Sequence, residues 1–85
     1  MKKSKRMREQ IFEIIENQIR DNNPPETKET FERLKKLGHS DFVVKQYIGQ
    51  YVAVELFNLM KYQKPFNEKR YIANLKKLPE EPFDD

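Results

Sequence analysis

The group in this chain whose chemistry most needs an explanation is the carboxylate of Glu55, which lies inside the most apolar stretch of the sequence, residues 42–60. With about 100° of rotation per residue, Glu55 falls on the arc of a helix that also holds Val44, Ile48, Tyr51, Val52 and Leu59. An isolated buried carboxylate is costly unless it is paired or hydrogen-bonded, and its pKa would otherwise rise. We therefore expect Glu55 to be buried with a partner.

Two roles for Glu55 stay open on the sequence alone. In a structural role, the carboxylate accepts from a tyrosine hydroxyl, a helix-start amide or a basic side chain, and so fixes the register of the helix. In a functional role, it binds a ligand or a proton. Chemistry with two carboxylates needs a second one nearby, and no other acidic residue shares a predicted core face. The sequence therefore favours the structural role.

The remaining reactive residues form no catalytic or metal-binding pattern. The chain has no cysteine, which excludes a thiolate nucleophile, a disulfide and a cysteine zinc site. Its one histidine, His39, lies in a predicted turn without acidic partners at metal-ligand spacing. Two glycines in the whole chain exclude a glycine-rich phosphate loop. We expect no enzymatic activity, no catalytic residue, no cofactor and no metal.

Two helices are predicted in the first half of the chain. Apolar residues at three- and four-residue spacing predict a helix over residues 5–22. The next helix is predicted to begin with Asn23 as its N-cap and Pro24 at its first helical position. This helix should run to Leu37, which is expected on the same side of the helix as Leu34. It should end where Gly38 adopts the left-handed conformation.

Two more helices are predicted in the second half. Ser40 is the expected N-cap of a helix that runs to about Tyr62, since its side chain would accept from a free amide of the first turn. Asn67 should cap the last helix, and Phe66 before it is positioned to pack on Tyr71 as a hydrophobic staple.

These elements predict a single all-α domain over residues 1–85, a small bundle of four helices joined by short loops. The third helix should be central because it has the widest apolar surface, and the short connections favour sequential antiparallel packing. Residues 1–4 are expected to form a basic arm, and residues 79–85 an extended acidic tail. The predicted core consists of Ile15, Leu34, Ile48, Val52, Leu56 and Leu75.

Gly49 is a second unusual residue of the third helix, because glycine in a helix interior costs about 1 kcal/mol relative to alanine. One interpretation is a close helix crossing at which a dimer interface could form, with Ala53 continuing a groove of small residues. The other is a glycine on the solvent side, beside Lys45 and Gln46. The sequence does not favour either.

The charge of the chain is concentrated at its ends, although the formal net charge is only +3. The tail is acidic, whereas the start of the chain carries the candidate nucleic-acid arm, Lys2, Lys3, Lys5, Arg6 and Arg8. Residues 27–50 also resemble a DNA-binding helix-turn-helix in their spacing. The resemblance stops at the turn, because a recognition helix needs a polar outer face and the first turns here offer Asp41, Phe42 and Val43.

A wider pattern covers residues 31–79. It comprises the turn around Gly38, Ile48-Gly49, Glu55, Pro65-Phe66-Asn67, Tyr71 and the run from Leu75 to Pro79. This pattern resembles small helical bacterial proteins classified only as domains of unknown function. The resemblance implies a compact helical domain and transfers no site, because such families have no assigned activity.

The function predicted from these observations is binding, of a protein partner or of a second copy in a homodimer. The alternative is a nucleic-acid-associated protein that uses the basic arm and the helix-turn-helix-like segment. A small apolar ligand held between helices is a third possibility. Polar residues interrupt the apolar stretch too often for a membrane span, so we expect a cytoplasmic protein that does not enter membranes.

Overall fold

The computed structural model describes residues 2–79 of the 85-residue chain, with side chains from Met7 onward. This part of the chain forms four α-helices, α1 (Lys2–Asp21), α2 (Pro25–Lys36), α3 (Asp41–Tyr62) and α4 (Glu68–Leu75), and no strand. The predicted all-α fold with four helices and short loops is confirmed. The expected acidic tail lies outside the described residues, apart from Pro79.

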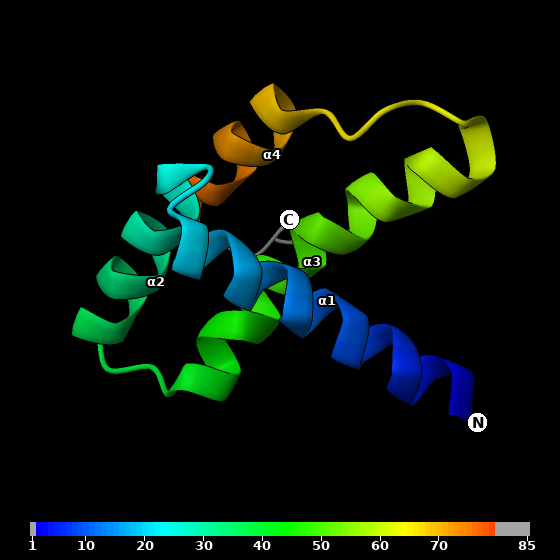
Figure 1. The fold of residues 1–85 in the computed structure, drawn as a ribbon. Helices are drawn as coiled ribbons and strands as arrows, with labels where there is room; N and C mark the ends of the chain where they lie inside the picture. Colours follow the sequence, from blue (N-terminus) through cyan, green and yellow to red (C-terminus); the bar gives the residue numbers. More distant parts are fainter. Residues whose placement is uncertain (1, 80–85) are drawn as a thin grey trace, which may run out of the picture.

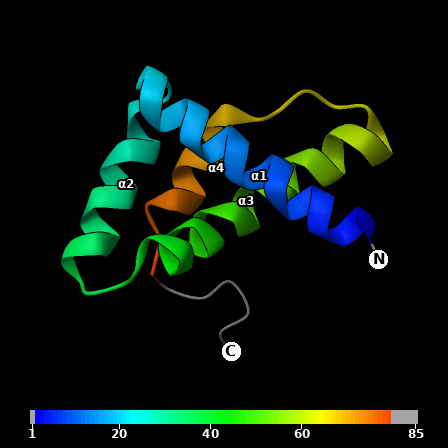
Figure 2. The same ribbon diagram turned by 60° about the horizontal axis from the view of Figure 1, so that its bottom comes forward.

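The two long helices, α1 and α3, cross each other steeply instead of lying side by side (Figure 1). The shorter α2 and α4 lie across this pair, on the side away from the N-terminus (Figure 2). As predicted, α3 is central and packs against the other three helices, and α2 also contacts all three. The expected sequential antiparallel order is wrong, because turns at Asn22 (φ 53°) and Gly38 (φ 105°) direct α2 across the long helices.

Pro25 rather than Pro24 is the first residue of α2, so the predicted start of this helix is wrong by one position. The N-cap is Pro24, with ψ of 149°, and no side chain caps this helix end. The reason is steric: a residue that precedes a proline is disfavoured in the helical region, so Pro24 stays extended before Pro25. Asn23 instead donates its backbone N–H to the carbonyl of Gln18, 3.0 Å away.

The junction between α2 and α3 follows the sequence closely. Gly38 adopts the predicted left-handed conformation, which a glycine reaches without steric cost. The Ser40 hydroxyl then accepts from the backbone N–H of Val43 at 3.3 Å, as an N-cap does. Leu37 lies in this turn and is 59% exposed, so it does not share the burial of Leu34.

The start of α4 is also as predicted. The Asn67 side chain accepts from the backbone N–H of Arg70 at 3.0 Å. The rings of Phe66 and Tyr71 meet edge to face with their centroids 5.2 Å apart. This hydrophobic staple fixes the direction in which the chain enters α4.

The core lies where α3 meets the other three helices. Five of the six predicted core residues have no exposed surface: Ile15, Leu34, Ile48, Val52 and Leu75. The remaining apolar core residues are Ile11, Val44, Tyr51, Tyr71 and Leu78.

The sixth predicted core residue, Leu56, is only partly buried, and Leu59 is 42% exposed. The expected burial of Leu56 and Leu59 is therefore wrong, and the direction of α3 gives the reason. Its last turns extend past the point where α1 and α3 cross, so side chains on its apolar faces there find fewer neighbours (Figure 1).

Polar side chains join α4 to the rest of the bundle. The Gln18 side-chain oxygen on α1 accepts from the hydroxyls of Thr27 on α2, at 2.7 Å, and of Tyr71 on α4, at 2.9 Å. Burial raises the pKa of Tyr71 to about 12, so its hydroxyl stays protonated and able to donate. Arg33 on α2 donates to the carbonyl of Leu75, at 3.1 Å, at the end of α4.

Candidate functional site

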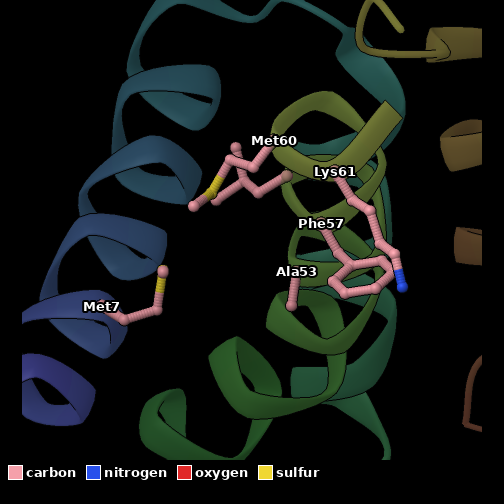
Figure 3. A pocket seen from close by; sticks show the side chains of 6 residues that line it. Met7, Ala53, Phe57, Met60 and Lys61 are labelled. Carbon is pink, nitrogen blue, oxygen red and sulfur yellow. The ribbon is translucent and has the colours of Figure 1, made fainter. Parts of the chain in front are cut away.

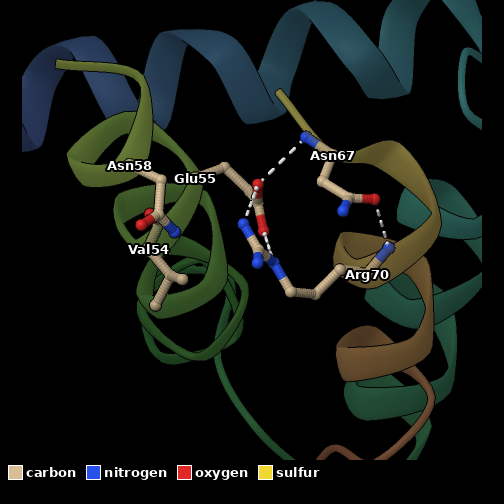
Figure 4. Close-up of polar contacts among 5 residues, drawn as sticks. All are labelled: Val54, Glu55, Asn58, Asn67 and Arg70. Atoms are coloured by element: carbon tan, nitrogen blue, oxygen red, sulfur yellow. Dashed lines mark hydrogen bonds and ion pairs between the residues drawn. The ribbon is translucent and has the colours of Figure 1, made fainter. Parts of the chain in front are cut away.

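Glu55 lies on the face of α3 that meets α4, and its side chain is fully buried. The Arg70 guanidinium donates twice to the carboxylate, from Nε to Oε2 at 2.7 Å and from Nη2 to Oε1 at 2.9 Å. The backbone N–H of Asn67 donates to Oε1 at 3.0 Å. Figure 4 shows both donors reaching Glu55 from the start of α4, Asn67 from the N-cap and Arg70 from the first turn.

The hydrogen bonds from Arg70 hold the pKa of Glu55 below its usual value, against the opposing effect of burial, and the Asn67 amide lowers it further. The carboxylate is therefore ionised, and both of its oxygens have donors. These partners are a helix-start amide and a basic side chain, the kinds that a structural role requires. Glu55 connects the middle of α3 to the start of α4 and has no oxygen left without a donor to act on a substrate.

The other reactive groups have structural surroundings. His39 is half-buried, and its ring meets the Tyr47 ring edge to face at 5.4 Å. Among the residues that the structure describes, no group of three acidic, histidine or cysteine side chains could hold a metal ion. No helix of the described chain has both the length and the apolar character needed to cross a membrane.

Gly49 is buried at the crossing of α1 and α3 within one chain. A Cβ atom at this position would lie 3.1 Å from Cγ2 of Ile11 on α1, closer than ordinary van der Waals contact. The contact agrees with the interpretation of Gly49 as a close helix crossing, and its placement on the solvent side is wrong because Gly49 is buried. Its absent side chain allows the two helices to approach. A dimer interface at Gly49 and Ala53 stays a prediction.

Beyond this crossing, an apolar groove of about 480 Å³ opens between the start of α1 and the last turns of α3. We define the groove by its lining residues, Met7, Ala53, Leu56, Phe57, Met60 and Lys61. Figure 3 shows Met7 on α1 facing the side chains of α3 across the opening. Phe57 is 56% exposed and Met60 is 69% exposed, so solvent reaches the apolar lining.

The groove continues the same face of α3 that carries Gly49. Residues four apart on a helix lie above one another, so Ala53 and Phe57 follow Gly49 along one side. At Gly49 this side is covered by Ile11 of α1, whereas Ala53 lines the opening between the two helices (Figure 3). The predicted row of small residues therefore leads from a contact within the chain into an open surface.

Lys61 supplies the polar group of the groove lining. Its ammonium lies over the rings of Phe57, at 5.4 Å from the centroid, and of Tyr62, at 5.7 Å. Both distances are typical of cation–π contacts. No carboxylate of the described residues forms an ion pair with Lys61, so its positive charge is available at the edge of the groove.

The basic residues at the start of the chain are helical rather than part of a separate arm. Helix α1 begins at Lys2, so residues 2–4 of the predicted arm belong to it. The side chains of Lys2, Lys3, Lys5 and Arg6 lie outside the described part of the chain. Arg8 is exposed and borders a second groove on the other side of Met7.

The start of α3, which would be the recognition helix of the helix-turn-helix-like segment, offers little free positive charge. Lys35 at the end of α2 pairs with Asp41 at the start of α3. Lys45, one turn on, pairs with Glu16 of α1 at 2.7 Å. The ring of Phe42 packs edge to face on Phe12 of α1 at 5.7 Å. The first turns of α3 are thus engaged with neighbouring helices instead of presenting a basic outer face.

Sequence reasoning identified Ala53 but missed the other groove residues. The signal was present, because α3 is apolar around most of its circumference and a helix of that kind has to be covered on every side. The three neighbouring helices cover only part of it, and the excess apolar surface marks the groove.

Comparisons of the chain with models of protein families, with curated proteins and with solved structures found no match. The resemblance over residues 31–79 to helical domains of unknown function therefore stays a prediction. The geometry of the groove is the observation from which a function is inferred.

Proposed function

We propose that this chain is a protein-binding module whose binding surface is the groove between α1 and α3. The observation that carries the proposal is the exposure of Phe57 and Met60 beside Met7. Methionine and aromatic residues are enriched in protein interfaces, where they fill pockets of the partner. A small domain leaves a large share of its surface exposed. A contiguous apolar patch on that surface is typical of an interaction site.

A protein partner suits this groove better than a small molecule does. Small-molecule sites enclose most of their ligand and fix its orientation with several placed polar groups. This groove is exposed to solvent at Phe57 and Met60, and among the residues that the structure describes Lys61 is the one charged residue of its lining. A partner that inserts a row of apolar side chains needs neither enclosure nor multiple hydrogen bonds. The lack of cysteine favours a cytoplasmic setting for this interaction.

The experiment that tests the proposal is photo-crosslinking in the cells that produce the protein. A benzoylphenylalanine placed at Met60, on the groove, should give a discrete crosslinked product that mass spectrometry identifies. The same group placed at Leu37 is the matched control, because Leu37 is also exposed and apolar but lies in the α2–α3 turn. Products absent at position 60, or the same at both positions, would contradict the proposal.

Nucleic-acid binding is the second candidate, supported by the five basic residues at the start of α1. Binding of this kind releases counterions, so it weakens steeply as salt rises. A gel shift with random duplex DNA at low salt tests it directly. No shift at low salt would remove this candidate, whereas a shift that is lost on deletion of residues 1–4 would support it.

A further inference from the structure

We infer that the segment bound in the groove is an amphipathic helix of another protein, with acidic residues beside its apolar stripe. The inference rests on the proposed function and adds the chemistry of the partner. It depends on three features of the described chain: the shape of the opening, the charge of Lys61 and the charge of the first turns of α1.

The shape of the groove fits a helix. After they cross near Gly49, α1 and α3 diverge, and the space between them widens toward the N-terminus of α1 (Figure 1, Figure 2). Two diverging helices form a V into which a third helix packs with its side chains between theirs. Recognition of this kind uses apolar anchors spaced three and four residues apart on the partner. Met7 on one wall and Phe57 and Met60 on the other would receive those anchors.

The charges of Lys61, on the groove, and of Arg8, beside it, are positive. Lys61 lies at the edge on α3 and has no ion pair among the described residues. Arg8, which borders the second groove on the other side of Met7, is exposed and likewise forms no ion pair there. Residues 2–8, which form the adjoining turns of α1, include five basic residues and no acidic one. A partner that places carboxylates beside its apolar stripe would complement this charge, which increases both specificity and association rate.

The same charges argue against a second copy of the chain as the occupant. In a twofold-symmetric dimer the same patch of both copies comes together. Two grooves packed together would then place positive charge on both sides of the interface, and like charges across an interface are destabilising. A partner with the opposite charge avoids this repulsion.

Three synthetic peptides of about 18 residues test the inference, each labelled for fluorescence anisotropy with the full chain. The first carries leucines at helical spacing with glutamates beside them. The second has lysines in place of the glutamates. The third has the composition of the first with its leucines scrambled. We expect the glutamate peptide to bind, the lysine peptide to bind at least about tenfold more weakly, and the scrambled peptide not to bind.

Variants of the chain test whether the glutamate peptide binds in the groove. Met60→Gln should weaken binding of the glutamate peptide, whereas the matched Leu37→Gln should leave it unchanged, because both residues are exposed and only Met60 lines the groove. Lys61→Glu should weaken the glutamate peptide by about fivefold and strengthen the lysine peptide. Lys28→Glu, an exposed position on α2, is the control for that charge change.

Each other outcome overturns the inference in a recognisable way. Equal binding of the glutamate and lysine peptides would remove the acidic partner while leaving the groove as a protein-binding site. Failure of all peptides, with dimers in light scattering that Met60→Gln dissociates, would make a second copy the occupant. Binding to anionic vesicles instead of peptides, sensitive to Met60→Gln, would replace the helix with a lipid surface. Failure of all these assays, together with no crosslink at position 60, would remove the proposed function as well.

Discussion

On one face of α3 the carboxylate of Glu55 is completely buried, whereas Phe57 and Met60, two and five residues later on the opposite face, are more than half exposed. This reverses the usual distribution, in which charged side chains are exposed and large apolar ones are buried. The difference comes from the neighbours of each face. Helix α4 brings an amide and a guanidinium to Glu55, while α1 diverges from the other face after Gly49. What covers a helix at each turn therefore decides burial more than residue type does.

The largest difference in stability is expected between a substitution in the core and a substitution in the groove. Ile48→Ala should lower the free energy of unfolding by about 2–5 kcal/mol, because Ile48 is fully buried on α3 and its loss leaves a cavity. Met60→Ala, on the same helix, should change it by no more than about 0.5 kcal/mol. Urea unfolding of both variants, followed by circular dichroism, measures this. Similar losses at both positions would mean that the groove is covered in the free protein.

Removing the hydrogen bonds of Glu55 should give the next largest change in the free energy of unfolding. Glu55→Ala removes the acceptor of three hydrogen bonds, and we expect a loss of about 2–3 kcal/mol in the free energy of unfolding. Glu55→Gln keeps the shape and one acceptor oxygen, so its loss should be smaller. Thermal melts at neutral pH compare the two variants. Melting like wild type in both would show that the contact with α4 contributes no stability, and would restore a functional role for the carboxylate.

Gly49→Ala tests how closely α1 and α3 must approach. Alanine favours the helix by about 1 kcal/mol, but its methyl group would crowd Cγ2 of Ile11, which is attached directly to a branched Cβ. Overpacking typically costs about 1–3 kcal/mol, so we expect a net loss of about 1 kcal/mol. In the background of Ile11→Ala, the same substitution should stabilise the helix. Stabilisation by Gly49→Ala alone would contradict the close crossing.

Acid should weaken the contact between Glu55 and α4 and leave the groove unaffected. The pKa of Glu55 is lowered in the folded chain from its usual value of 4.5, so its contribution is complete above that pH. As pH falls below 4.5 the unfolded carboxyl takes up a proton first, and the contribution is lost progressively as pH falls through the lowered pKa. The difference in stability between wild type and Glu55→Gln should therefore shrink across this window. A difference that is constant with pH would contradict the lowered pKa.

The smallest effect is expected from shortening α1 at the open end of the groove. Deleting residues 1–4 removes only the first turn of a helix end, so the free energy of unfolding should fall by less than about 0.5 kcal/mol. The proposed acidic partner should nevertheless bind more weakly, because two of the four deleted residues, Lys2 and Lys3, are cationic. A large loss of stability would show that this turn packs on the bundle.

Local sequence determined the helices and most of their ends. Ser40, Asn67 and Phe66 perform the capping and stapling predicted for them, because these interactions involve residues only three to five positions away. The spacing of apolar residues likewise identified the arc that holds Glu55, and the cost of burying a charge indicated which kinds of partner it needs. Even the wrong start of α2 has a local cause, the effect of Pro25 on Pro24.

Only the tertiary structure decided which neighbour each face meets. Periodicity places Val52 and Leu56 on one side of α3, but Val52 is buried and Leu56 borders the groove, because α1 crosses at Gly49 and then diverges. The bond between Gln18 and Tyr71 spans 53 positions, and the one between Glu55 and Arg70 spans 15. Such contacts depend on the directions in which the helices leave their turns, and residue spacing within one helix carries no information about that direction.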